Sequence, residues 1–328
     1  MKNHNYIYYP QVLQMEPPAE IWVGDHLNGF DQYHCNSILD KLSETQHEKT
    51  IVWTGYIVND SVQTNYPKLD IRYRWLRWMW QSVENLDHTV GKNYKNFICS
   101  FNGTEHIGRQ FLTSALYKHG WFSKQYCSKN FTATQNRIDG NILQFHNEQQ
   151  SRFSRKFIVN DSADSDDFYN TVHGFDYDSR TDHNANVNVL HHKISESFVN
   201  IVSETMATSY HPFVTEKFLY SIVCRGLFVT YAQPGWHRHV QKYYGFKPYT
   251  KIFDYAFDQV ANPVDRLLAL LAMVGKFSQL TTDDWNDLYL MEKDTIDYNY
   301  DHYMSQRYLQ HLKESLHGRP WDTHNNFL

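Results

Sequence analysis

The amino-acid sequence predicts an α/β fold, in which short apolar strands alternate with longer helical stretches. Segment 197–231 contains a strand, a helix and a second strand in succession, and the helix is bounded by Thr215 and Gly226. Such a unit is typical of doubly wound parallel sheets. The 328 residues are 41% hydrophobic and 16% aromatic, which is enough apolar material for two cores.

The first domain is expected to span residues 1–93. Runs 21–24 and 50–55 are short, apolar and end at glycines, so both are expected to be strands. Segment 36–42 suits a helix. Aromatic residues at helical spacing predict another helix over 70–83.

The second domain is expected to span residues 94–280. It opens with a buried strand at 96–101, and the following helix, 109–119, is closed by Gly120 at its C-cap. A polar stretch at about 160–190 has weak periodicity and predicts a long surface excursion.

Order is expected to resume with strand 197–202, followed by a helix that Thr215 caps and that runs to Arg225, and by strand 227–231. Further on, Asn262-Pro263 supplies an N-cap and a first helical turn.

The C-terminal part, residues 281–328, is expected to contain one or two helices over 282–316. The tail after Gly318 is expected to fray.

Composition narrows the class of protein. The net charge of −5 does not suggest a polyanion-binding protein. Neither a signal-peptide core nor a long apolar run is present, so we expect a soluble, cytoplasmic protein. The cysteines form no CxxC pair and are expected to be buried thiols; they are Cys35, Cys99, Cys127 and Cys224.

The sharpest local signal is Thr215-Glu216-Lys217 at a predicted helix start. A lysine there opposes the helix dipole unless an anion is bound, and a phosphate would meet both the helix N–H groups and the ammonium. Glu216 would accept hydrogen bonds from ribose hydroxyls. The alternative is that Glu216 only complements the dipole and Lys217 is solvated.

Three further signals follow predicted strands. Arg109 lies near a helix start and offers a forked donor for a diphosphate. Ser203-Glu204 lies at a strand end, where α/β sheets hold ligands. His237 follows the loop after strand 227–231 and is a candidate contact for the donor sugar. The alternatives are an exposed arginine, a simple turn and a histidine with local partners.

Together these segments resemble the α1,3/α1,4-fucosyltransferases. Segment 95–102 with Arg109 resembles the opening of that family's donor domain, and 197–205 is similar to the strand before its donor site. Segment 213–217 resembles its Tyr/Phe-Val/Ile-Thr-Glu-Lys motif, whose Glu and Lys contact the ribose and phosphate of the donor. Segment 235–246 is similar to related glycosyltransferases of viral and bacterial origin.

This resemblance covers roughly residues 94–270. It implies a GT-B fold, meaning two Rossmann-like domains with the donor bound by the C-terminal one, here followed by a C-terminal helical segment. It also implies inverting transfer of fucose or a related hexose from a nucleotide sugar, with a GDP-sugar favoured and no obligatory metal or other cofactor. The expected partners are this donor and a glycan or other hydroxyl-bearing acceptor, with a nucleic-acid acceptor open but not favoured.

The catalytic base is left open. The family carries a glutamate after a Thr-Gly step, whereas Tyr56 follows Thr54-Gly55 here. An inverting transfer needs a group that takes the acceptor's proton. Asp25, after the strand end at Gly24, is the preferred candidate. The other candidates share a place in loops after predicted strands; they are His26, Asp31 and Asp60.

Two rival interpretations remain. The missing glutamate favours a catalytically inactive glycan-binding or structural relative. The triplet Asp176-Tyr177-Asp178 has the DxD pattern of metal-dependent glycosyltransferases, although it follows no clear strand. His191-His192 and His237-Arg238-His239 are weak candidates for metal ligands, so no metal site is expected.

Overall fold

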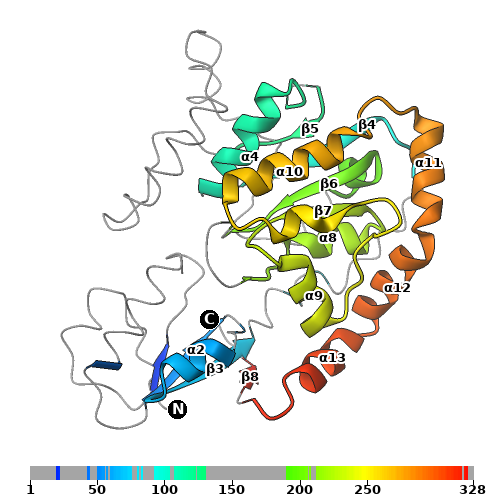
Figure 1. Ribbon diagram of the computed structural model, residues 1–328. Coiled ribbons are helices and arrows are strands. Elements are labelled where there is room, and N and C mark those ends of the chain that lie inside the picture. The colour runs from blue at the N-terminus through cyan, green and yellow to red at the C-terminus, as the bar shows by residue number, and fades with distance from the viewer. Residues whose placement is uncertain are drawn as a thin grey trace, which may run out of the picture.

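The protein folds around two parallel sheets. The computed structural model describes residues 20–22, 43–44, 50–55, 57, 60–75, 80, 83, 92–103, 107–122, 124–130, 190–205, 207, 212–319 and 321–323. Within these residues, strands form two four-stranded sheets with the orders β1-β2-β3-β8 and β5-β4-β6-β7, and every pairing is parallel. Figure 1 shows the sheets in separate parts of the molecule. The predicted α/β class is confirmed.

The first sheet contains β1 (Glu20–Trp22), β2 (Thr50–Thr54) and β3 (Leu69–Trp75), with helix α2 (Asp60–Asn65) between β2 and β3. The strand predicted at 50–55 is confirmed. The helix predicted over 70–83 is wrong for residues 70–75, which belong to β3. Their burial has a period of two, because the buried side chains are those of Leu69, Ile71, Tyr73 and Trp75.

The fourth strand of this sheet comes from the far end of the chain. Strand β8 (Trp321–Thr323) pairs with β3, with Trp321 opposite Tyr73. The prediction that the tail frays after Gly318 is therefore wrong for residues 321–323.

The second sheet consists of β4 (Asn96–Ser100), β5 (Tyr126–Cys127), β6 (Ser197–Ser203) and β7 (Leu227–Tyr231), as Figure 1 shows. The strands predicted near 96, 197 and 227 are confirmed. All seven residues of β6 are buried, because this strand lies between β4 and β7 and carries helices on its faces.

The strand order creates a topological switch point. From β4 the chain passes through helix α4 (Ile107–Lys118) to β5 on one side, and from β6 it passes through α8 (Lys217–Val223) to β7 on the other. Right-handed crossovers in opposite directions place their helices on opposite faces of the sheet. Open α/β sheets generally bind ligands at such a switch point, outside the carboxyl ends of the strands.

Several helix ends follow their sequence signals. Gly120 adopts the left-handed φ of +68° after α4, as its C-cap prediction requires. Asn262 caps α10 (Pro263–Gly275) through hydrogen bonds from the N–H groups of Val264 and Asp265, so that prediction is also confirmed. Helix α8 ends at Val223 rather than Arg225, and Arg225 itself has the positive φ of 49° that ends the turn.

The C-terminal helices connect the two sheets. Three helices occupy the region where one or two were predicted: α11 (Thr282–Met291), α12 (Lys293–Met304) and α13 (Arg307–Ser315). They follow one side of the molecule from the second sheet to the first (Figure 1). The Tyr308 ring of α13 packs against Trp75 of β3, and the Tyr303 hydroxyl of α12 donates to the carbonyl of Trp80.

An aromatic cluster lies where these helices meet β3. The ring of Trp80 stacks on Tyr244 at 4.7 Å and on Tyr308 at 5.2 Å between ring centroids, and it meets Phe218 edge-on. The hydroxyls of Tyr73 and Tyr244 share a hydrogen bond of 2.8 Å. Because Tyr73 is on β3 and Tyr244 ends helix α9 (Trp236–Tyr244), the cluster ties the first sheet to the helices of the second.

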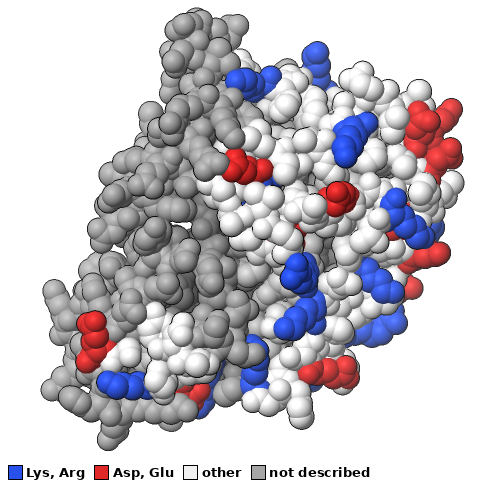
Figure 2. All heavy atoms as spheres, viewed as in Figure 1, with Lys and Arg blue, Asp and Glu red and all other residues white. Residues whose placement is uncertain are grey.

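The surface carries both signs of charge. On the face shown in Figure 2, Lys and Arg side chains are interspersed with Asp and Glu, and acidic side chains gather over α11, whose first turn carries Asp283 and Asp284. None of the helices in the described part of the chain has the length and apolar character of a membrane span.

Candidate functional site

The candidate site lies at the carboxyl edge of the second sheet. The loops after β4, β6 and β7 begin there with Phe101, Glu204 and Ala232, and these strands run parallel. The backbone N–H of Glu204 donates to the carbonyl of Tyr231, 3.1 Å away, so the loops after β6 and β7 begin side by side. The sequence signals after these strands are thereby brought to one edge.

A buried carboxylate organises the loop between β6 and α8. Glu204 has no exposed surface and accepts two hydrogen bonds from Thr215: one of 3.1 Å from the backbone N–H and one of 2.5 Å from the hydroxyl. Burial raises the pKa of Glu204, and the nearby Lys217 charge and the Thr215 hydrogen bonds oppose this shift.

Lys217 completes a polar chain that starts at Glu204. Its Nζ donates to Thr215 Oγ1 at 3.0 Å and lies 3.4 Å from Glu216 Oε1. Since the ammonium can only donate, the Thr215 hydroxyl accepts a hydrogen bond from Lys217 and donates its own hydrogen bond to Glu204. The side chain of Lys217 is 22% exposed, whereas that of Glu216 is 9% exposed, so the cation is the accessible end of the chain.

The predicted cap of helix α8 is wrong. Thr215 makes no cap; Glu216 occupies the N-cap position with a helical backbone and no side-chain cap bond, and Lys217 is the first helical residue. The Thr215 hydroxyl is engaged by Glu204 instead, and this partner lies eleven positions earlier in the sequence. Helix α8 therefore lacks the side-chain cap that was predicted, and Lys217 is held by its contacts with Thr215 and Glu216.

Arg109 lies on the other side of the switch point. It is the third residue of α4 and only 3% exposed. The preceding Gly108 lets α4 approach the loop after β6, because a Cβ at position 108 would lie 2.6 Å from the Cβ of Ala207. The start of α4 and the loop that follows Glu204 are therefore in contact.

The remaining polar groups at this edge include one acceptor without a donor. Asn102, which follows β4, donates through Nδ2 to Ser100 Oγ and to the Ser128 carbonyl. Its buried Oδ1 has no hydrogen-bond partner among the described residues, which is uncommon for a buried amide. Ser203 is buried at the end of β6, and its hydroxyl lies 3.4 Å from the Glu204 carbonyl oxygen.

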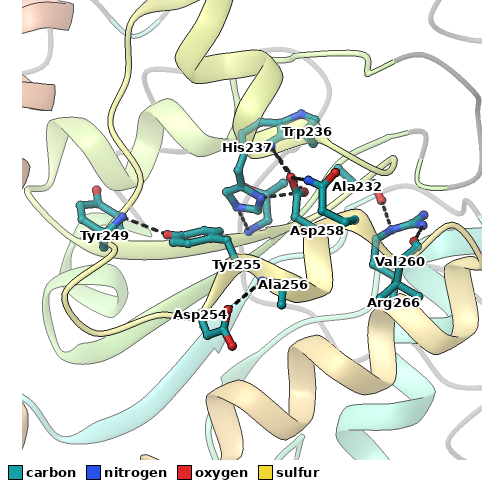
Figure 3. A network of polar contacts seen from close by, with 12 residues as sticks. Ala232, Trp236, His237, Tyr249, Asp254, Tyr255, Ala256, Asp258, Val260 and Arg266 are labelled. Carbon is teal, nitrogen blue, oxygen red and sulfur yellow. Dashed lines mark hydrogen bonds and ion pairs between the residues drawn. The ribbon is translucent and has the colours of Figure 1, made fainter.

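His237 makes contacts within the protein through both ring nitrogens. Nε2 accepts a hydrogen bond of 3.1 Å from the N–H of Thr230, and Nδ1 lies 2.9 Å from Asp258 Oδ1 (Figure 3). Because a backbone N–H only donates, the ring proton must be on Nδ1 and point to Asp258. The imidazole thus covers an N–H of β7, the edge strand of the sheet, and holds α9 against it. Its predicted contact with a donor sugar stays a prediction.

Sequence reasoning missed several buried charged residues beside this edge, of which Asp258 and Arg266 hold neighbouring elements together. Asp258 lies in the 3-10 helix η1 (Tyr255–Gln259) and holds His237, while Arg266 of α10 is 1% exposed and donates to loop carbonyls (Figure 3). Arg266 had a signal, because it lies three residues after Pro263 and four before Leu270, on the buried face of the helix. Asp258 had no periodic signal.

The other predicted residues are placed as follows. The preferred base, Asp25, lies outside the described residues, as do His26, Asp31 and the Asp176–Asp178 triplet. Asp60 begins α2. The rings of His191 and His192 are neighbours, but among the described residues no three His, Cys, Asp or Glu side chains are grouped to hold a metal ion.

Comparisons with known proteins add little. No protein-family model matches the sequence, and no curated protein is detectably similar to it. One solved structure, the N-terminal domain of trehalose-6-phosphate phosphatase from Candida albicans, is 8% identical with a TM-score of 0.29, over 85% of this chain and 74% of that chain. A likeness at this TM-score carries no argument about fold or function.

Proposed function

We propose that the protein is a glycosyltransferase that moves a sugar from a nucleoside-diphosphate donor to a hydroxyl group of an acceptor. The observation that carries the proposal is the switch point between β4 and β6, with Arg109 at the start of α4 and the Glu204–Thr215–Lys217 chain after β6. Cations on the elements that follow both strands of a switch point suit a diphosphate. The resemblance of segment 213–217 to the fucosyltransferase donor motif supports the same assignment.

The proposed reaction is a displacement at the anomeric carbon. The acceptor oxygen forms the new bond, the bond to the diphosphate oxygen breaks, and the acceptor proton passes to a base for which Asp25 is the candidate. Lys217 and Arg109 would offset the charge that develops on the leaving diphosphate, and this electrostatic stabilisation is the main catalytic contribution we assign to the chain. Glu216 would accept hydrogen bonds from the ribose.

The proposed donor is a GDP-sugar of fucose or a related hexose, and the transfer is inverting without an obligatory metal. Both details come from the family resemblance. The interspersed surface charges in Figure 2 and the net charge of −5 favour a glycan or another uncharged acceptor over a nucleic acid.

The test is a calorimetric panel of GDP, UDP and other nucleoside diphosphates, each with manganese and with EDTA. We expect one diphosphate to bind without metal, and Lys217→Ala to weaken it roughly 10- to 100-fold, since a charge-assisted hydrogen bond contributes about 1.5–3 kcal/mol. Lys242→Ala is the matched control, because Lys242 is an exposed lysine in the last turn of α9. Binding that requires manganese and survives Lys217→Ala would instead support a DxD enzyme.

A second candidate is an inactive relative that binds glycans. It is favoured by Tyr56, which stands where the family's catalytic glutamate is expected after Thr54-Gly55. Slow release of nucleoside diphosphate from the bound sugar nucleotide separates the two candidates, because only an active enzyme hydrolyses its donor. Loss of that release in Lys217→Ala would assign the hydrolysis to this site.

A further inference from the structure

Arg266 is a buried cation whose described hydrogen bonds all end on backbone carbonyls. Its Nε donates to Ala232 at 2.8 Å, its Nη1 to Val260 and Ala261 at 2.5 and 2.9 Å, and its Nη2 to Ala207 at 2.6 Å. Figure 3 shows the guanidinium beside the Ala232 and Val260 carbonyls. These bonds use four of the five N–H groups of an arginine.

The four carbonyls belong to three separate loops at the carboxyl edge. Ala207 lies in the loop that joins Glu204 to Thr215, Ala232 opens the loop after β7, and Val260 and Ala261 lead into α10. Few backbone hydrogen bonds join the described residues of these loops, among them those from Glu204 to Tyr231 and from Gly235 to Asp258, so a planar fork that reaches all three loops helps to fix their spacing.

The bond to Ala207 holds a loop that touches the helix of one cation of the candidate site and leads along the chain to the other cation. The Cβ of Ala207 is the surface against which Gly108 of α4 fits, directly before Arg109. On the other side, the loop of Ala207 leads to Thr215 and so to Lys217. An apolar side chain would fill the space of Arg266 without the cost of burying a charge, so packing alone does not account for an arginine here.

We propose that Arg266 is a positioning residue that sets the distance between the loops carrying Arg109 and Lys217, so that both cations can meet one diphosphate. This inference rests on the proposed function, because it assigns the loop geometry to donor binding. Arg266 itself does not touch the donor.

The test compares Arg266→Lys and Arg266→Gln with Asn299→Leu. Asn299 is also buried and bridges a loop backbone, with bonds of 2.8 and 2.9 Å to Lys247, but it lies on α12 away from the edge. Thermal unfolding ranks the variants by their loss of stability, and calorimetry measures their affinity for the diphosphate that the wild-type protein binds.

We expect each Arg266 variant to lose about tenfold or more in affinity. Asn299→Leu should stay within about twofold of the wild-type affinity, even if it loses as much stability as Arg266→Gln.

Arg266→Lys is the decisive variant. It keeps the charge and most of the volume of the arginine, yet one ammonium cannot span carbonyls of three loops. We therefore expect Arg266→Lys to be more stable than Arg266→Gln but to bind the diphosphate no more tightly than that variant. If Arg266→Lys binds the diphosphate as the wild-type protein does, or if Asn299→Leu loses as much affinity as the Arg266 variants, the positioning role is wrong.

Amide hydrogen exchange supplies a readout that needs no nucleotide. In the Arg266 variants, amides of residues 203–217 and 231–237 should exchange faster than in the wild-type protein, and those of β4 at the same rate. Asn299→Leu should leave both segments as protected as in the wild-type protein. If wild-type protein binds no diphosphate, the proposed function fails, and the exchange result still decides whether Arg266 orders these loops. If the loops stay protected in the Arg266 variants, the inference fails even where the nucleotide binds.

Discussion

At the scale of single residues, two opposing effects act on the pKa of the Glu204 carboxyl group: its burial and its hydrogen bonds. Its burial raises its pKa, yet Thr215 donates to it and Lys217 lies at the far end of the same chain. The charged groups that face it are Lys217, which opposes the shift, and Glu216, which adds to it. Desolvation is the largest of these effects, so the acid form is favoured in the folded protein relative to the unfolded chain.

This imbalance predicts a pH dependence of stability. Between the ordinary carboxyl pKa of 4.5 and the raised native pKa, the folded protein binds more protons than the unfolded chain, so the free energy of unfolding should fall as pH rises through that window. The wild-type protein should lose roughly 1.4 kcal/mol of unfolding free energy for each unit by which the pKa of Glu204 is raised. Glu204→Gln mimics the protonated acid and should not show this loss. Urea unfolding of both proteins at a series of pH values measures the effect. Parallel curves for the two proteins would contradict it.

The residue types of the candidate site could be predicted from the sequence, but their contacts could not. Arg109, Glu204 and Lys217 follow strands that local patterns identify, and parallel strands bring their ends to one edge. The partner of Thr215 is Glu204, which the sequence places far outside the reach of a helix cap. Arg266 owes its role to four carbonyls in three loops, and backbone positions in loops leave no trace in a sequence pattern.

At the scale of elements, the start of α4 depends on one glycine. Gly108→Ala would place a methyl group 2.6 Å from the Cβ of Ala207, and neither atom can rotate away, so α4 must shift. The overlap costs about 1–3 kcal/mol, partly offset by the better helix propensity of alanine, about 0.8–1 kcal/mol. Because Arg109 moves with the helix, we expect a loss of nucleotide affinity of about tenfold, measured by calorimetry.

The control lies at the opposite end of the same helix. Gly120 has φ of +68° and no atom near its missing Cβ, so Gly120→Ala strains the backbone by about 1–2 kcal/mol without moving Arg109. Equal affinities in the two variants would show that the approach of α4 to Ala207 does not matter for binding.

Elements were predicted well where one physical signal dominated. Strands β4, β6 and β7 are mostly apolar and buried, and α10 carries its cap in its sequence. Strand β3 was mistaken for part of a helix because Trp75 and Trp78 fit helical spacing. The alternation of Leu69, Ile71 and Tyr73 with Asp70 and Arg72 was the better guide, since only a strand turns every second side chain to the core.

At the scale of the whole molecule, the C-terminal segment of the chain completes the first sheet. Helices α11 to α13 lead from the second sheet to the first, and β8 adds a parallel strand beside β3. A parallel partner from the far end of the chain leaves no local sequence signal, because the intervening helices and loops set its register. This long-range pairing is why the tail was predicted to fray.

The pairing of β8 predicts different outcomes for two truncations. A chain that ends at Gly318 lacks β8, so the edge of β3 from Tyr73 to Trp75 loses its hydrogen-bonding partners and the apolar surface of Trp321 is removed from the core. We expect the free energy of unfolding to fall by about 1.5–3 kcal/mol, the contribution of one large apolar side chain. A chain that ends at Thr323 keeps β8 and should match the full-length protein. Urea unfolding compares the three, and size-exclusion chromatography should show self-association of the shorter chain alone, because an unpaired strand edge recruits other chains. If both truncated chains are equally stable, β8 does not hold the first sheet together, and the C-terminal helices must hold β3 through the rings of Trp75 and Tyr308 instead.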